Sequence, residues 1–366
     1  MSSHSGNFNR SQVIDKNSRR TFPARSVLFS LRLEILGLLF CVSCIISVGM
    51  AHARLIADQD EVSLRALEEA RQAYDASQYE RVIDVLKNVS ANHSHSEKVV
   101  LWRMKSYYEM RQMDAAIATG EKAIGVHPNS SEIHMWLGRA YGRKAEKAGI
   151  LSGMSLAKKT RREFETAVRI DPANLEAQQD LVEYYCSAPA IMGGGEEKAQ
   201  RQIAAIAALD AAEGHFARAE CWSDEKDWSR ADAEFQVALR ADQKRAFVVF
   251  EIADYFTMRR QPDRIVESAE AGAMRAPGDS RADFYRGVAL VLKNERLAEA
   301  ELHLKSYLEK APKRMAFPSH AATHEWLGRL YEQQGRREAA ANEYGAALQA
   351  DPQNKAVREA VKRLPH

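Results

Sequence analysis

A set of small, aromatic and proline residues recurs along the chain in a fixed frame of about 34 residues, which restricts the fold to stacked units. The clearest unit starts at Ala321 and has its defining residues at positions 7, 8, 11, 15, 20, 24, 27 and 32. These residues are Leu327, Gly328, Tyr331, Gly335, Ala340, Tyr344, Ala347 and Pro352. Small residues at positions 8, 20 and 27 let two helices approach closely. The proline ends the second helix because it has no N–H and its ring clashes with the preceding turn.

The same frame appears in other parts of the chain. Further copies start at Glu97, Ser131 and Ala246, and weaker ones start near Ser63, Leu175, Ala212 and Ser280. This indicates about eight hairpins over residues 60–352, followed by a polar helix over residues 354–364. One hairpin cannot bury both of its faces, so neighbouring hairpins must stack, and the polar helix would cap the stack.

This pattern resembles the consensus of the tetratricopeptide repeat family. The resemblance implies an all-α fold, a right-handed superhelical solenoid of about eight helix-turn-helix repeats with a carboxyl-terminal capping helix, over residues 60–364. Two insertions interrupt the frame, near residues 143–156 and 187–196. The second reads Ala188-Pro189 and then Gly193-Gly194-Gly195, and it resembles an Ala-Pro-x-x-x-Gly-Gly insertion in exported bacterial members. We predict a hairpin turn with positive φ at these glycines.

In this family the first helix of each repeat lines a concave groove. Transferring the family's groove positions predicts a partner-binding surface made of Trp102, Lys105, Trp136, Arg139, Arg143, Phe250, Trp326 and Arg329. Aromatic residues and arginine are the side chains that most often anchor a partner. The alternative is that the three tryptophans, all at position 6, pack against the next helix and belong to the core. The acidic residues Glu183, Glu220 and Asp254 occupy groove positions in the middle repeats, so a bound peptide would need opposed charges there.

The amino-terminal residues have the composition of an export signal. A basic stretch precedes an apolar run from Ile35 to Met50, and Ala51-His52-Ala53 follows. We therefore predict a signal peptide over residues 1–53 and a periplasmic location. An inner-membrane anchor formed by residues 27–50 is the alternative, and membrane contact is expected only through this leader. Ser18-Arg19-Arg20 leaves the twin-arginine route open beside general secretion.

Two cysteines, Cys186 and Cys221, follow the leader, and they lie 35 residues apart. This separation is close to one repeat, so the two side chains could face each other on neighbouring hairpins and form a disulfide. Two small buried apolar residues are the other interpretation.

Charge and motifs limit the functions that the chain can have. Residues 1–53 hold six basic and two acidic side chains, which leaves 46 basic and 48 acidic in the remainder, so no nucleic-acid partner is predicted. No Gly-x-Ser-x-Gly, His-Glu-x-x-His or Cys-x-x-Cys motif follows residue 53, and no catalytic residue, metal site or cofactor is predicted. We therefore predict a non-enzymatic scaffold or adaptor of the bacterial cell envelope that binds a partner peptide or helix. A self-associating assembly subunit, and an enzyme subunit with its site in the insertions, remain the alternatives.

Overall fold

A computed structural model of the chain describes residues 60–89, 96–241 and 245–364, and no strand occurs in these ranges. The predicted signal peptide or anchor lies outside them. Residues 62–366 form one compact unit. Among the described residues, no helix combines the length and the apolar character that a membrane crossing needs.

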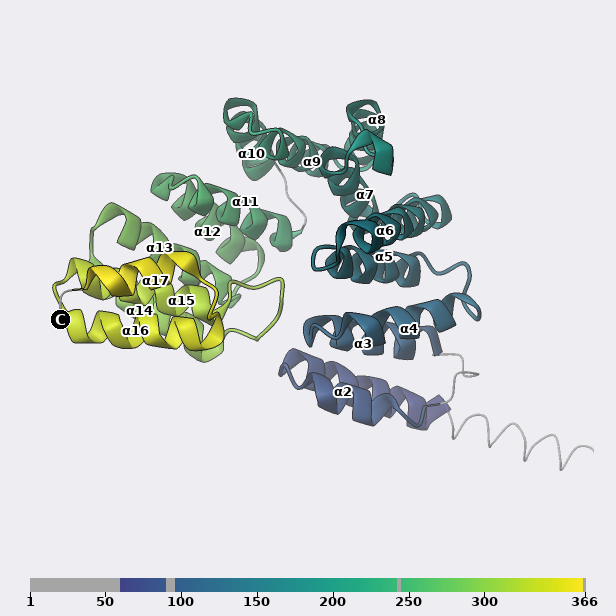
Figure 1. The fold of residues 1–366 in the computed structure, drawn as a ribbon, viewed down its shortest axis with the longest axis horizontal. Coiled ribbons are helices and arrows are strands. Elements are labelled where there is room, and N and C mark those ends of the chain that lie inside the picture. The colour runs from purple at the N-terminus through teal and green to yellow at the C-terminus, as the bar shows by residue number, and fades with distance from the viewer. Residues whose placement is uncertain (1–59, 90–95, 242–244, 365–366) are drawn as a thin grey trace, which may run out of the picture. The chain divides into compact units, whose positions relative to one another are not determined.

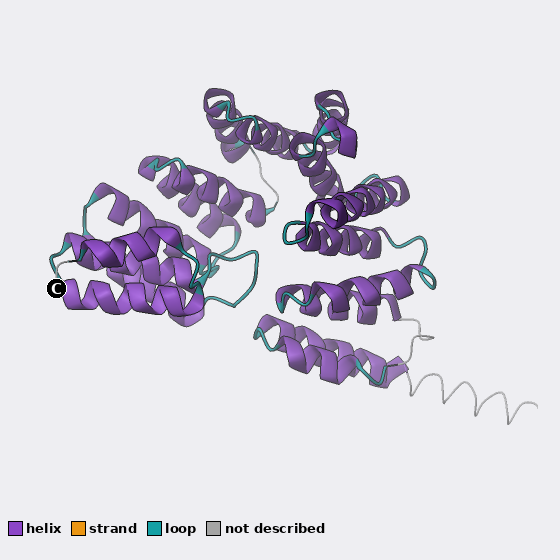
Figure 2. Ribbon diagram, in the orientation of Figure 1, coloured by secondary structure: helices purple, strands orange, loops and turns teal. Residues whose placement is uncertain are grey.

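Sixteen helices of the described residues form eight hairpins, and a seventeenth helix follows them (Figures 1 and 2). The first hairpin pairs a helix over residues 60–75 with α2 (Tyr79–Leu86). The others, in chain order, are α3 (Ser96–Glu109) with α4 (Met113–Ile124), α5 (Ser131–Ala145) with α6 (Ile150–Ile170), α7 (Leu175–Ser187) with α8 (Glu196–Leu209), α9 (Ala211–Asp224) with α10 (Trp228–Arg240), α11 (Ala246–Met258) with α12 (Pro262–Arg275), α13 (Arg281–Lys293) with α14 (Leu297–Lys310), and α15 (His320–Gln333) with α16 (Arg337–Ala350). The last helix is α17 (Lys355–Arg363). The predicted all-α repeat solenoid is confirmed.

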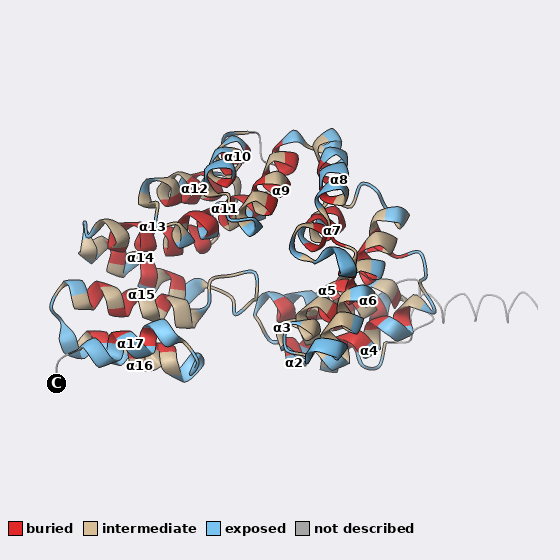
Figure 3. Cartoon of the chain, turned by 45° about the horizontal axis from the view of Figure 1, so that its top comes forward, coloured by how far each residue is buried: buried red, intermediate tan, exposed pale blue. Residues whose placement is uncertain are grey.

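Close helix packing explains the small residues of the frame. A Cβ atom placed on Gly328 of α15 would lie 2.5 Å from the ring of Tyr344 on α16, and one on Gly138 of α5 would lie 2.5 Å from the ring of Phe164 on α6. Tyr344 is fully buried, so its ring cannot move out of the way. In Figure 3 the buried residues lie on the facing sides of neighbouring helices. The glycine at position 8 is therefore required by the aromatic residue at position 24.

The two insertions have different structures. Most of the residues near 143–156 are helical, since α5 continues to Ala145 and α6 begins at Ile150 and runs for 21 residues. The second insertion forms a short 3₁₀ helix, η1 (Ala190–Met192), followed by a glycine turn. Gly193 and Gly195 have φ values of +89° and +143°, which confirms the predicted turn with positive φ.

A disulfide joins Cys186 at the end of α7 to Cys221 on α9. The two Cα atoms lie 5.3 Å apart, and the bond links the first helices of the fourth and fifth hairpins. Of the two interpretations that the sequence left open, the structure has the disulfide.

Candidate functional site

Aromatic rings and cations alternate along the first helices of the second and third hairpins. The Nζ atom of Lys105 lies 5.6 Å from the ring centroid of Trp102 and 5.3 Å from that of Trp136. Trp102 also packs against Tyr74 at 4.9 Å, and Trp136 packs against Tyr108 at 5.4 Å. Both indoles remain partly accessible to solvent. These two tryptophans at position 6 therefore pack against neighbouring helices and still present part of each ring to solvent. Their contact with a partner stays a prediction.

The two arginines predicted on α5 are engaged in different ways. Arg139 lies over Trp136, with its guanidinium 4.8 Å from the ring centroid, and its Nε donates to Asp180 on α7 over 2.6 Å. Arg143 donates from Nε to the Tyr108 hydroxyl over 3.4 Å and pairs with Glu146, the residue that directly follows α5. Arg139 is thus committed to a carboxylate of the next hairpin, whereas Arg143 is held mainly by its own.

A pocket of about 550 Å³ lies beside this aromatic stretch. Lys105 and Trp136 line it together with Ser130 and Ser131 at the start of α5 and Asn174 at the start of α7. The first turns of two neighbouring helices therefore border the same hollow as two of the predicted groove residues.

The first helices of the next three hairpins carry eight carboxylates, of which Glu176 pairs with Arg139 and Glu213 pairs with Arg245. The other six form three pairs spaced three or four residues apart. They are Asp180 and Glu183 on α7, Glu220 and Asp224 on α9, and Glu251 and Asp254 on α11. We refer to them as the acidic stretch. Asp180 is paired with Arg139, whereas no described lysine or arginine forms an ion pair with the other five. The spacing of three or four residues places the two members of each pair on the same face of their helix.

The acidic stretch is open to water and yet largely surrounded by protein. Glu183, Asp224 and Asp254 are exposed, but burial raises the pKa of all three. Water reaches these carboxylates, and the protein around them disfavours their charged form. This combination is typical of side chains that line a concave surface.

Mutual repulsion adds to this effect inside the acidic stretch. Burial and then the charges of Glu183 and Glu251 raise the pKa of Glu220 well above its ordinary value. Burial and the charge of Asp254 raise the pKa of Glu251 to about 8, and burial raises that of Asp254 to about 6. Carboxylates on three successive hairpins therefore act on one another as a single electrostatic surface.

Phe250 does not line this surface. Its side chain is 1% exposed, stacks on Tyr285 at 5.9 Å, and would meet any Cβ added at Gly272 at 2.5 Å. The prediction that it contacts a partner is corrected, because position 5 of this repeat packs inward against α12 and α13. The neighbouring Glu251, which the predicted set omitted, is the side chain that faces the acidic stretch.

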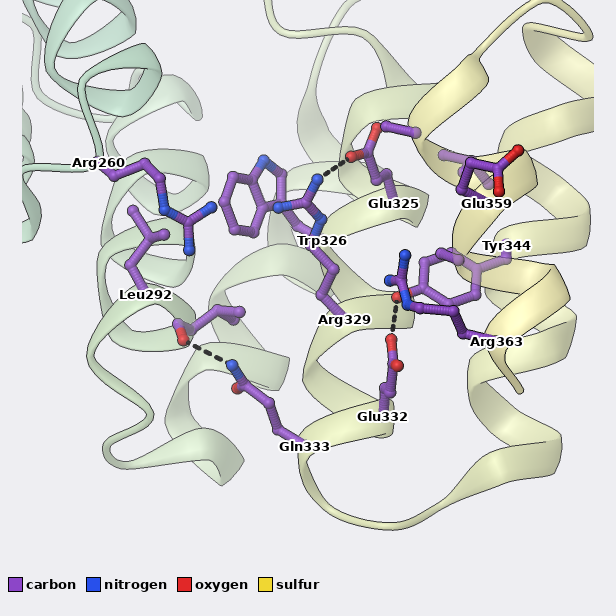
Figure 4. A pocket seen from close by; sticks show the side chains of 14 residues that line it. Arg260, Leu292, Glu325, Trp326, Arg329, Glu332, Gln333, Tyr344, Glu359 and Arg363 are labelled. Atoms are coloured by element: carbon purple, nitrogen blue, oxygen red, sulfur yellow. Dashed lines mark hydrogen bonds and ion pairs between the residues drawn. The ribbon is translucent and has the colours of Figure 1, made fainter. Parts of the chain in front are cut away.

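The remaining two predicted residues line a second pocket, of about 460 Å³, between α13, α15 and α17 (Figure 4). The guanidinium of Arg329 lies 4.7 Å from the Trp326 ring centroid and pairs with Glu325 at 2.5 Å. Arg260 also points toward this indole, and Arg363 of α17 lies at the rim. The last helix therefore forms one wall of a pocket that the Trp326 indole also lines.

No group of three or more histidine, cysteine, aspartate or glutamate side chains in the described part of the chain is arranged to hold a metal ion. The sequence frame identified the helices that carry the candidate surface. It omitted Asp180, Asp224 and Glu251, although the spacing of acidic residues on three successive first helices was a usable signal.

We compared the chain with known protein families and with solved structures. Residues 313–355 match the family described as tetratricopeptide repeat. No curated protein matches the chain. Among solved structures, a thermophilic tetratricopeptide repeat protein from Thermus thermophilus is 18% identical, with 52% of this chain and 97% of that chain covered and a TM-score of 0.43.

Two further solved structures resemble the chain with comparable sequence identities and TM-scores. A tetratricopeptide repeat protein from Parabacteroides merdae is 11% identical, with 82% and 98% of the two chains covered and a TM-score of 0.42. PilF of Pseudomonas aeruginosa is 13% identical, with 63% and 96% covered and a TM-score of 0.41. Residues 313–355, which contain the clearest unit of the frame, are therefore a tetratricopeptide repeat, and the described residues as a whole form eight helical hairpins.

Proposed function

We propose that this protein is a non-enzymatic interaction scaffold that binds a segment of a partner protein along the first helices of its hairpins. The acidic stretch carries this proposal, because five of its six carboxylates lack an ion-pair partner among the described residues. Like charges held close together raise the free energy of the unbound surface, and a cationic partner removes that cost on binding. The bound segment therefore carries lysine or arginine where it crosses α7, α9 and α11.

The flanking surfaces fit the same mode of binding. Partly exposed indoles lie on the amino-terminal side of the acidic stretch, at Trp102 and Trp136, and one lies on the carboxyl-terminal side, at Trp326. Large aromatic side chains contribute much of the binding energy at interfaces, and charged groups contribute mainly orientation and association rate. The partner is thus anchored by apolar contacts at two positions and oriented by charge between them.

A charged peptide probe tests the proposal on the full chain. A fluorescent peptide of alternating lysine and alanine, about twelve residues long, spans ~40 Å when extended. We expect it to bind the wild type at pH 8, and we expect Asp224→Asn with Asp254→Asn to weaken binding about tenfold or more. The matched control, Glu295→Gln with Glu338→Gln, removes the same charge at exposed positions outside the acidic stretch.

Equal binding by the two double variants would show that net charge alone recruits the probe, and the acidic stretch would not be a binding surface. A glutamate–alanine peptide of the same length should not bind at all. Raising the salt concentration should weaken the binding of the lysine–alanine peptide to the wild type, since exposed charges are screened beyond about 10 Å at 0.1 M ionic strength.

We also propose that the repeats act outside the cytoplasm, in the bacterial cell envelope. The export-like leader supports this location, and the disulfide between Cys186 and Cys221 supports it independently because structural disulfides persist mainly in oxidising compartments. Amino-terminal sequencing of the protein from its native membrane and periplasmic fractions is the test. A start at Arg54 in the periplasmic fraction is expected, whereas an intact leader in the membrane fraction would favour an anchored protein.

A further inference from the structure

The loop between α14 and α15, residues 311–319, reaches the first two hairpins of the array (Figure 3). Tyr79 on α2 donates from its hydroxyl to the carbonyl of Lys313 over 2.8 Å. The backbone N–H of Lys313 donates to the Ser77 hydroxyl over 2.9 Å. The N–H of Met315 donates to the Glu109 carboxylate over 2.7 Å. Residues more than 200 positions apart in the sequence are thus joined through the backbone of the loop.

Arg314 forms the centre of this contact. Its Nη2 pairs with the Asp75 carboxylate at 2.7 Å and donates to the Tyr74 carbonyl over 3.3 Å. Its guanidinium also lies 4.8 Å from the ring centroid of Tyr74. The Tyr74 hydroxyl in turn donates to Glu109 over 3.1 Å, so the ring and the carboxylate that receive the loop also hold each other in place.

These contacts have the form of a bound peptide. Two successive groups of the loop backbone, the N–H and C=O of Lys313, meet side chains, and the arginine that follows is held by both a carboxylate and an aromatic ring. Such main-chain recognition with one anchoring side chain is a common way for a surface to hold an extended segment.

We propose that residues 311–319 form a clasp, a chain segment that occupies a peptide-docking site on the first two hairpins and that an arginine-containing extended segment of a partner can displace. The occupied site consists of Tyr74, Asp75, Ser77, Tyr79 and Glu109. Displacement frees the first two hairpins from the seventh and eighth and opens the array. This proposal does not depend on binding at the acidic stretch.

Two features make the clasp displaceable. The Nε atom of Arg314 is buried without a hydrogen-bond partner, and the desolvation of an unpaired donor opposes docking. Asp75 is exposed, so solvent screens its pairing with Arg314. The loop still competes with a partner segment for the docking site, because it belongs to the same chain and therefore acts at a high effective concentration.

Hydrogen exchange on the full chain tests the clasp. We expect Arg314→Ala to accelerate amide exchange at Lys313 and Met315 at least about tenfold, and to accelerate it in residues 74–79, because all of these positions lose a fixed neighbour. The matched control is Arg230→Ala. Arg230 also pairs with a carboxylate, Asp227, and lies 3.8 Å from the Trp222 ring centroid, but all three belong to one hairpin. This control should leave exchange in both segments unchanged.

A peptide added in trans tests the docking site itself. The synthetic peptide of residues 311–319 should restore protection of residues 74–79 in the Arg314→Ala chain, and a peptide with glutamate in place of arginine should not. Unchanged exchange in Arg314→Ala overturns the clasp, and failure of the wild-type peptide to protect overturns the docking site. Arg314→Gln, which leaves the docking site unchanged, replaces Arg314→Ala in both measurements if circular dichroism shows that the latter is unfolded.

Discussion

Arg139 on α5 donates a 2.6 Å hydrogen bond from Nε to Asp180 on α7, while its guanidinium lies over the indole of Trp136. One side chain therefore connects the aromatic stretch of the second and third hairpins to the acidic stretch that begins on the fourth. The exposed fractions of the two partners are 21% and 15%, so the pair is only partly screened by water.

Removing Arg139 should destabilise the array. We expect Arg139→Ala to lower the free energy of unfolding by about 1–3 kcal/mol, because Asp180 is left as a partly buried, unpaired carboxylate. Urea denaturation of Arg139→Ala, Asp180→Asn and the double variant measures the coupling. If the single losses add up in the double variant, the pair contributes nothing to stability.

Stability should depend on pH through Glu251. The carboxyl ionises near pH 4.5 in its ordinary state and at about pH 8 in the folded chain, where burial and Asp254 raise its pKa and Arg281 partly offsets them. Between these pH values the folded chain binds more protons than the unfolded chain, so the free energy of unfolding falls as the pH rises.

The variant Glu251→Gln should flatten this dependence. We expect it to exceed the wild type in stability by about 1–3 kcal/mol at pH 9, after allowing for partial solvent access, and to differ little at pH 5. Urea midpoints across this range provide the measurement. Glu338→Gln, at an exposed position, should follow the wild-type curve, and a parallel curve for Glu251→Gln would contradict the prediction.

Two glycines of the eighth hairpin should respond to alanine in opposite directions. A methyl group at Gly328 lies 2.5 Å from the Tyr344 ring, whereas at Gly345 nothing lies within 4 Å. We expect Gly328→Ala to cost about 1–3 kcal/mol through overpacking, and Gly345→Ala to add up to about 1 kcal/mol through higher helix propensity. Thermal and urea denaturation of the two variants compares them directly. A gain from Gly328→Ala would refute close packing at position 8.

The disulfide should stabilise the fourth and fifth hairpins. Reduction frees a loop of 35 residues between Cys186 and Cys221 in the unfolded chain, so we expect a loss of about 2–4 kcal/mol. Melting curves with and without dithiothreitol measure this loss. The variant with both cysteines changed to alanine should be insensitive to the reductant. Equal sensitivity of wild type and variant would show that the reductant acts elsewhere.

The repeat frame predicted the hairpins because the residues that define it act locally. Gly328 and Tyr344 lie 16 positions apart and meet within one hairpin, so their spacing in the sequence reflects their contact in space. The glycine turn after α7 was predictable for the same reason, since the turn conformation depends on the residues that form it.

Other features depend on several repeats at once. Phe250 and Glu251 are neighbours in sequence, and a rotation of one residue about α11 decides which side chain enters the core and which reaches the acidic stretch. The contact of Arg314 with Asp75 spans 239 positions and results from the cumulative curvature of the intervening hairpins. The spacing of residues within one repeat therefore could not predict a contact that depends on the curvature of many repeats.

The contact that residues 311–319 make with the first two hairpins also constrains how many hairpins the chain can have. In an open solenoid each hairpin touches only its neighbours, so a gene can duplicate or delete a unit with little consequence for the others. Here, duplication or loss of any hairpin between α3 and α14 would carry Arg314 past Asp75 or leave it short. Single residues of the chain can therefore change independently, whereas a change in the number of hairpins would break the contact between Arg314 and Asp75.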